Sequence, residues 1–291
     1  MATPKTLAET LRFEGVGLHT GESCVVVLHP LEAEPARPPK LGLPAHLLIR
    51  KGNHTFPARW DFVVDTTRAT VLGDGATRLS TVEHLMAALW MTGITHCLIE
   101  CVRGSEVPIL DGSALPFVEA IRNRFVFLPH QDGGKLGAEG HSLLSGGCPV
   151  LEVRAADRYL VWHPVGDALI GYIQFPEPLG VQAGAFRSSS AAAEIAPART
   201  FGFLHEVETL RRQGLAHGAT LENALVIGET GYYNPARFAD EPLRHKLLDV
   251  LGDLYLCGAY VSAFSLTAIK PGHALNVRLA QRIAQWLYAE D

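Results

Sequence analysis

One histidine and one aspartate late in the chain are spaced as a pair of metal ligands. His245 and Asp249 are four residues apart, so on a helix their side chains share one face, one turn apart. Pro242 marks the start of such a helix. A neutral imidazole and a carboxylate both suit a borderline metal such as zinc. The pair also fits an ordinary hydrogen bond on a solvated helix face, so a metal site requires a third ligand from elsewhere.

A second histidine, with a carboxylate beside it, lies in the first half of the chain. Ser80-Thr81-Val82-Glu83 fits a capping box, in which Ser80 is the N-cap and Glu83 bonds back to it. That role would fully explain Glu83. The other interpretation starts from His84, because a carboxylate next to a metal ligand is placed to act as a general base. If His84 joins the later pair, two imidazoles and one carboxylate leave a fourth position open, which is the pattern of catalytic zinc.

A third histidine, His273, follows Gly272 where a turn enters a helix. The N-terminus of a helix disfavours a protonated imidazole. A charged His273 therefore needs an acidic neighbour, and Asp253 is the candidate, one turn beyond Asp249 on the same predicted helix. The alternative is a turn histidine that bonds only to backbone.

Four other residues are candidates for contact with a substrate. Lys246, next to His245, can reach an anionic group beside the metal or can be simply solvated. Thr200 can donate a hydrogen bond to a developing oxyanion, and Phe201 can stack on a ring. His19 lies in a glycine-rich turn that can contact phosphate. The commoner explanations are strand or core positions for Thr200 and Phe201, and a plain turn residue for His19.

Length, composition, net charge and cysteine count restrict the class of protein. The chain has 291 residues, of which 47% are hydrophobic and 19% charged, a composition that supports a folded core and argues against disorder. A formal net charge of −5 gives no sign of a nucleic-acid-binding protein. Five scattered cysteines fit reduced thiols better than a disulfide framework or a four-cysteine zinc site. We recognise no signal peptide and no membrane-spanning stretch, and so expect a cytoplasmic protein.

The elements that carry these residues recur in the two halves of the sequence. A strand-like run that ends near His29 is matched by one that ends near His163. The helix with His84 corresponds to the helix with His245, and each is followed by a glycine and an apolar strand. Chance recurrence of apolar patterns is the alternative. A true duplication predicts two similar α+β domains, with the two corresponding helices facing one another at a ligand-binding interface.

This repeat predicts the boundaries of the two domains and of the linker between them. The first α+β domain spans 1–128, a glycine-rich linker 129–147, and the second domain 148–291. Extra residues in the second half are placed as an insertion at 203–227. Within the first domain a second helix is expected over 114–125.

Seven short motifs, taken in order, make the pattern specific. They are Gly15-Val16-Gly17-Leu18-His19-Thr20-Gly21, Leu79-Ser80-Thr81-Val82-Glu83-His84-Leu85, Leu110-Asp111-Gly112-Ser113-Ala114, Ala198-Arg199-Thr200-Phe201-Gly202-Phe203, Arg244-His245-Lys246-Leu247-Leu248-Asp249, Gly252-Asp253-Leu254 and Gly272-His273-Ala274-Leu275-Asn276. The ordered set spans nearly the whole chain and resembles the zinc-dependent UDP-3-O-acyl-N-acetylglucosamine deacetylases of lipid A biosynthesis. Each motif alone is weak, whereas their order is highly specific.

The resemblance implies a metal centre and its base. His84, His245 and Asp249 are the implied zinc ligands, and Glu83 is the implied general base that deprotonates water. His273 resembles the charged histidine of that family, which stabilises the oxyanion or protonates the leaving amine.

The resemblance also implies supporting and substrate-binding roles. Asp253 would support the charged histidine, and Thr200 would help to hold the tetrahedral intermediate. Phe201 and Lys246 match positions that contact the UDP-sugar, Lys246 through phosphate, and His19 matches a further member of that set.

The implied fold is α+β, with two related domains whose sheets sandwich their helices. The insertion corresponds to a βαβ element that lines a channel for a fatty acyl chain, and Leu204, Val207 and Leu210 are candidate lining residues or plain core. The implied reaction is hydrolysis of UDP-3-O-(3-hydroxyacyl)-N-acetylglucosamine to the amine and acetate, the committed step of lipid A biosynthesis. The alternatives are a zinc amidohydrolase for another N-acylated sugar and a non-catalytic sugar-nucleotide-binding homologue. A monomer is expected, because one chain supplies the whole site.

Overall fold

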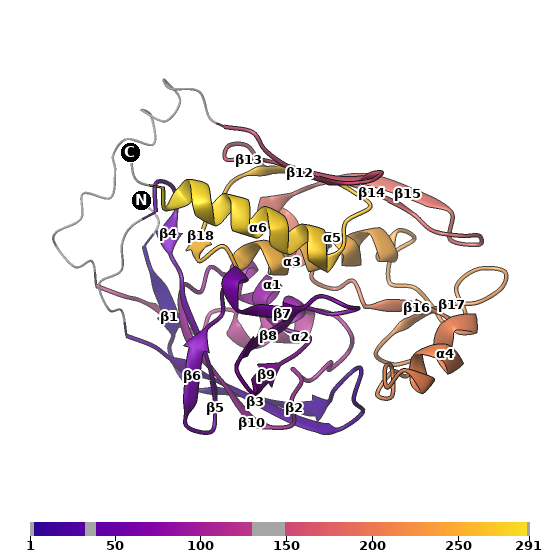
Figure 1. Cartoon of the computed structure of the whole chain (residues 1–291), viewed down its shortest axis with the longest axis horizontal. Coiled ribbons are helices and arrows are strands. Elements are labelled where there is room, and N and C mark those ends of the chain that lie inside the picture. Colours follow the sequence, from indigo (N-terminus) through magenta and orange to yellow (C-terminus); the bar gives the residue numbers. More distant parts are fainter. Residues whose placement is uncertain (1–2, 33–38, 130–148, 290–291) are drawn as a thin grey trace.

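Two β-sheets enclose a layer of helices (Figure 1). The structure is a computed structural model that describes residues 3–32, 39–129 and 149–289. The first sheet contains β1 (Lys5–Leu7), β2 (Leu11–Val16), β3 (Ser23–Pro30), β5 (His46–Lys51), β6 (His54–Pro57), β10 (His96–Arg103) and β11 (Phe125–Phe127). The second sheet contains β12 (Leu151–Ala155), β13 (Arg158–His163), β14 (Ala168–Gln174), β15 (Val181–Arg187) and β19 (Ser265–Ile269).

The two sheets share one topology. In the first, β10 pairs antiparallel with β3 and parallel with β5, while β2 and β6 pair antiparallel at either side. In the second, β19 pairs antiparallel with β13 and parallel with β14, while β12 and β15 occupy the outer places. The order β2-β3-β10-β5-β6 is therefore repeated as β12-β13-β19-β14-β15. This confirms the predicted fold of two related α+β units.

Among the residues that the structure describes, five helices form the layer between the sheets. They are α1 (Glu83–Thr92), α2 (Leu115–Ile121), α3 (Ala191–Glu194), α5 (Glu241–Tyr255) and α6 (His273–Leu287). Of these, α1 and α5 are the most completely buried. Every residue of α1 from Glu83 to Trp90 is buried, and on α5 only Arg244 and Lys246 reach partial exposure. A helix packed between two sheets needs apolar side chains on more than one face, which explains why α1 shows no single apolar stripe.

One glycine allows α1 and α5 to pack at backbone distance. A Cβ atom built on Gly252 of α5 would lie 2.0 Å from the backbone oxygen of Glu83 and 3.1 Å from the backbone nitrogen of Ala87. No side chain other than hydrogen fits there without moving a helix. The first turn of α1, which carries His84, is thereby held against the C-terminal half of α5.

Smaller elements complete the structure. They are β4 (Leu43–Pro44), β7 (Val63–Asp65), β8 (Val71–Asp74), β9 (Thr77–Leu79), β16 (Phe201–Phe203), α4 (Val207–Arg212), β17 (Leu225–Ile227) and β18 (Ala259–Tyr260). β16 and β17 pair in parallel with α4 between them, so the predicted βαβ insertion is present and begins at Phe201. It projects to one side of the helix layer (Figure 1). The predicted linker lies, apart from Pro129, outside the described residues.

The helix expected over 114–125 is shorter than predicted. It ends at Ile121, Asn123 takes a left-handed backbone conformation with φ of 62°, and Phe125–Phe127 forms β11. β11 pairs antiparallel with β1, so ladder hydrogen bonds to a distant strand replace the last helical turn. Sequence periodicity carries no information about such a partner.

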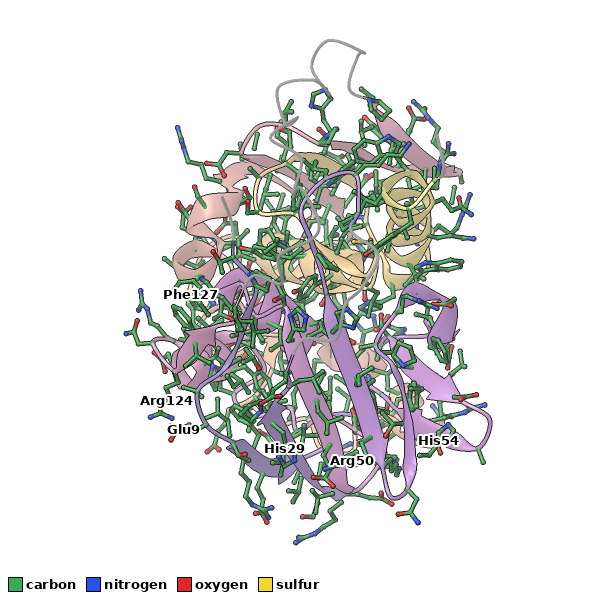
Figure 2. All side chains as sticks on the ribbon, turned by 90° about the vertical axis from the view of Figure 1, so that its left-hand side faces the viewer. Glu9, His29, Arg50, His54, Arg124 and Phe127 are labelled. Carbon is green, nitrogen blue, oxygen red and sulfur yellow. The ribbon has the colours of Figure 1, made fainter. Side chains whose placement is uncertain are left out.

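The outer side of the first sheet carries paired charges. Figure 2 shows His29, Arg50 and His54 together at that end of the molecule. His29 Nε2 lies 2.7 Å from Glu100 Oε2, which Arg50 also contacts at 3.1 Å. His29 beside Glu100 and His54 beside Asp74 are therefore surface histidines that contact carboxylates. In the described part of the chain, no helix is both long and apolar enough to cross a membrane.

We predict that Gly252→Ala destabilises the protein, although alanine is intrinsically the better helix former. The added methyl group must push α1 and α5 apart, at a cost of about 1–3 kcal/mol in the free energy of unfolding. Chemical denaturation measures the change. Gly202→Ala is the control, because nothing lies within 4 Å of a Cβ there. An unchanged or increased stability of Gly252→Ala would show that the two backbones do not touch.

Candidate metal centre

Two of the candidate ligands come from α5. His245 and Asp249 are buried on one face of this helix, and His245 Nε2 lies 3.4 Å from Asp249 Oδ1. The other ring nitrogen of His245, Nδ1, donates a hydrogen bond to the carbonyl oxygen of Ala198 at 3.1 Å. This bond fixes the tautomer, so that Nε2 presents its lone pair towards Asp249.

The third candidate ligand comes from the start of α1. His84 Nε2 lies 3.9 Å from Asp249 Oδ1, and the His84 and His245 rings meet edge to face with centroids 5.0 Å apart. One potential ligand atom from each of His84, His245 and Asp249 lies within 4.8 Å of the others. The structure thus brings together the imidazole of the first half and the imidazole–carboxylate pair of the second.

The chemistry of this cluster fits a metal ion. Asp249 Oδ1 is buried and has no hydrogen-bond partner within the described ranges, an arrangement that is costly unless a cation satisfies the oxygen. Burial lowers the pKa of His84 to about 3, and burial likewise lowers the pKa of His245, so both rings are neutral at pH 7. Two neutral imidazoles and one carboxylate are the donor set of a borderline cation such as zinc.

Lys246 bonds to the same carboxylate. Its Nζ donates to Asp249 Oδ2 and lies 5.9 Å from the centre of the Phe201 ring. Burial alone would raise the pKa of Asp249, but the positive charges of Lys246 and His273 help to bring it well below its usual range. The contact expected from the sequence, between Lys246 and a substrate phosphate, stays a prediction.

Glu83 stands beside the cluster without serving as a helix cap. The capping-box prediction is wrong, because α1 begins at Glu83 after Val82, and Ser80 Oγ donates instead to the carbonyl of Ser105. The Glu83 carboxylate accepts a hydrogen bond from the backbone N–H of Thr70 at 3.0 Å. Burial raises the pKa of Glu83 to about 7. A carboxyl group that titrates near neutral pH is suited to accept a proton.

His273, the first residue of α6, is held by buried polar partners. Its Nδ1 donates to Asp253 Oδ2 at 2.9 Å, and Asn276 Nδ2 donates to the same oxygen at 2.9 Å. Burial lowers the pKa of His273, but the charge and hydrogen bond of Asp253 outweigh it and raise the pKa to about 9. At neutral pH this site therefore contains a charged imidazole whose Nε2–H is not used by Asp253.

One cavity of about 620 Å³ opens onto most of these groups. Glu83, His84, His245, Asp249 and His273 line it. Thr200, Phe201 and Lys246 line it too, as do four further basic residues, Arg68, Arg158, Lys270 and Arg278. The cavity therefore offers positive charge for an anionic ligand around the buried cluster of candidate metal ligands.

The residues expected along an acyl channel are not part of this cavity, and their role stays a prediction. Leu204, Val207 and Leu210 are not among the residues that line this cavity, and Leu204 is 45% exposed. Phe203 and His205, from the same insertion, do line it. The insertion thus reaches the cavity through the end of β16.

The loop with His19 is shaped by a residue that sequence reasoning missed. Buried Glu106 accepts hydrogen bonds from the backbone N–H groups of His19 and Thr20 and from the hydroxyl of Thr81. Leu18 lines the cavity, so this loop forms part of its rim. Burial lowers the pKa of His19. No local pattern distinguishes Glu106, because its partners are more than twenty residues away.

A second missed feature fixes the segment before Thr200. Arg199 Nε donates to Glu241 Oε1 at 2.8 Å, and both residues are buried. Glu241 is the first residue of α5, so this ion pair ties the Ala198 carbonyl and Thr200 to the helix of His245. The sequence motif 198–203, which contains Arg199, pointed to this segment, but it did not identify Glu241 as the partner of Arg199.

Comparison with known proteins identifies the family. The family model for UDP-3-O-acyl N-acetylglycosamine deacetylase matches residues 4–285. The chain belongs to this family. The resemblance drawn from the seven motifs is thereby confirmed, and deacetylases are hydrolases.

Curated members of the deacetylase family align along the whole chain. Proteins named UDP-3-O-acyl-N-acetylglucosamine deacetylase from Thermosynechococcus vestitus and Syntrophotalea carbinolica are 40% and 38% identical to it, each over 288 residues. The alignments cover 97% of this chain and 94% and 88% of those proteins. The protein of that name from Aquifex aeolicus is 36% identical, covering 98% of this chain and 94% of its own length.

We predict that the buried neutral state of His84 makes the metal-free protein sensitive to acid. Its pKa is about 3 when folded against a model value of 6.5, so between these values the unfolded chain binds more protons. The contribution of this group to stability is complete above pH 6.5 and is lost towards pH 3, by at most about 1.4 kcal/mol per pH unit.

The measurement compares wild type with His84→Gln by urea unfolding in chelator from pH 7.5 to 4.5. Both proteins share the other titrating groups, so the difference isolates His84. The stability advantage of the wild type should shrink as pH falls. A difference that stays constant with pH would mean that His84 is not held neutral.

Proposed function

We propose that the protein is a zinc-dependent amidase that removes the acetyl group from UDP-3-O-(3-hydroxyacyl)-N-acetylglucosamine, the committed step of lipid A biosynthesis. One observation carries the proposal: three residues that could hold a metal ion, a carboxyl group with a pKa near neutrality and a charged histidine line one cavity. Relatives named for this reaction support the choice of substrate. The reaction adds water across the amide C–N bond and gives acetate and the free amine.

The metal would be held by His84, His245 and Asp249. When bound, zinc supplies Lewis acidity that polarises the amide carbonyl and makes water a nucleophile at neutral pH. Three protein ligands leave a coordination position open, as hydrolysis requires. The Ala198 carbonyl and Lys246 orient His245 and Asp249 from behind.

The acid–base work falls to two residues whose pKa values differ. Glu83, with a pKa near 7, accepts the proton of the attacking water. His273, with a pKa near 9, carries a proton that it donates to the oxyanion or to the departing amine. Asp253 keeps His273 charged, and Thr200 on the cavity wall donates a hydrogen bond to the tetrahedral intermediate. Environments that push two pKa values apart are how one site supplies both acid and base.

We expect the substrate to bind in the cavity through charged and apolar contacts. Lys246, Arg158 and Lys270 provide positive charge for the diphosphate, and Phe201 provides a ring face. The loop that contains His19 forms part of the rim of the cavity, and we include His19 among the residues that contact the substrate. The acyl chain would leave past Phe203 along the insertion, where Leu204, Val207 and Leu210 would contact it. We propose a monomeric cytoplasmic enzyme, because one chain provides every group named.

The direct test is acetate release by the zinc-loaded protein. The acylated UDP-N-acetylglucosamine should be hydrolysed, whereas free N-acetylglucosamine should react at least about 100-fold more slowly in kcat/KM, since it lacks the diphosphate and acyl contacts. Equal rates on both sugars would indicate an amidohydrolase for another N-acylated substrate. Ligand binding without any acetate release would indicate a non-catalytic homologue.

We also predict that Glu83→Gln and His273→Gln each lower kcat by about 10²-fold or more while zinc stays bound, because each removes a proton-transfer group and no ligand. Steady-state acetate release gives kcat, and metal analysis gives the zinc content. His29→Gln is the matched control, since His29 pairs with Glu100 on the outer side of the first sheet. Full activity in either site variant would refute its role.

A further inference from the structure

A threonine that precedes β8 touches both halves of the acid–base machinery. Thr70 is fully buried. Its backbone N–H donates to Glu83 Oε2 at 3.0 Å, and its carbonyl accepts from the backbone N–H of Val82 at 3.3 Å. Its hydroxyl donates to Asp253 Oδ1 at 2.5 Å. One residue thus contacts the first turn of α1 and, through Asp253, the last turn of α5.

The donors around Asp253 show what the hydroxyl does. Asp253 Oδ2 accepts from His273 Nδ1 and from Asn276, and Oδ1 accepts from Thr70. A threonine hydroxyl has one proton, which this bond uses, and its lone pairs face His273 Nδ1 at 3.3 Å. Without the hydroxyl, Oδ1 would be a buried anionic oxygen lacking a donor, free to rotate towards other partners. Asp253 would then no longer hold the imidazole in one orientation.

We propose that Thr70 is a positioning residue that fixes the proton acceptor Glu83 and the proton donor His273 relative to each other. The proposal rests on the function proposed above and assigns Thr70 no contact with substrate. The backbone of Thr70 places Glu83, and its side chain places His273 through Asp253. The two groups come from different helices, α1 and α6, so a shared anchor keeps their separation constant while substrate enters.

The test separates the hydroxyl from the backbone. Thr70→Val keeps the shape and the N–H to Glu83 but removes the donor to Asp253, whereas Thr70→Ser keeps both. In the full-length zinc-loaded protein, Thr70→Val should lower kcat by roughly 10- to 100-fold, with KM changed by less than about threefold and zinc content unchanged. Thr70→Ser should stay within about threefold of wild type in kcat.

Thr95→Val is the matched control. Thr95 is equally buried, but its hydroxyl donates to the carbonyl of Lys5 at the first sheet, whereas that of Thr70 donates to Asp253. It should lose stability as Thr70→Val does, with kcat within about twofold of wild type. If Thr70→Val keeps the kcat of wild type, or if Thr95→Val lowers kcat as much, the positioning role is wrong.

A second readout is independent of turnover. The ¹H–¹⁵N NMR spectrum of the histidine side chains, with His273 assigned from His273→Gln, reports the hydrogen bond at Nδ1. This signal should move in Thr70→Val and stay in place in Thr70→Ser and Thr95→Val. If wild type releases no acetate, the proposed function fails on its own. The NMR shift then still decides whether Thr70 positions His273, since an unchanged signal would overturn that role.

Discussion

The close approach of α1 and α5 is the constraint on which the remaining structure depends. Gly252 lets the backbone of Glu83 touch α5, and one turn earlier α5 presents Asp249 to the next residue, His84. The two sheets, with their repeated strand order, pack on either side of these helices. A candidate metal centre whose residues come from two such units is complete only when both are folded, so the geometry of the site depends on the packing of the core.

Burial, together with the nearest charged partner, sets the protonation state of each polar group in the site. The histidines of the cluster are neutral because their surroundings exclude water, whereas His273 is charged because Asp253 outweighs the same desolvation. Asp249 balances its charge with Lys246 on one oxygen and leaves the other without a partner among the described residues. The oxygen without a hydrogen-bond partner and the two neutral rings lie close together, an arrangement whose chemistry fits a bound cation.

Local patterns in the sequence predicted only part of this arrangement. The i,i+4 spacing of His245 and Asp249 predicted that the two side chains share a helix face. The recurrence of the strands predicted the fold of two related units. The contacts of Thr70, Glu106 and Gly252 were not predicted, because they join segments far apart, 183 residues in the case of Thr70 and Asp253. Ser80 was misassigned as a cap for a similar reason, since a distant carbonyl competes for its hydroxyl. Tertiary partners decide between local alternatives that the sequence allows equally.

An anomalous-difference map from zinc-soaked crystals, recorded at the zinc edge, tests the central claim most directly. We expect one strong peak per chain, about 2.0–2.2 Å from a ring nitrogen of His84, a ring nitrogen of His245 and an oxygen of Asp249. A peak bound by the α5 pair alone, with His84 turned away, would contradict a site shared by the two halves. An ordered, metal-free cluster at saturating zinc would contradict it as well.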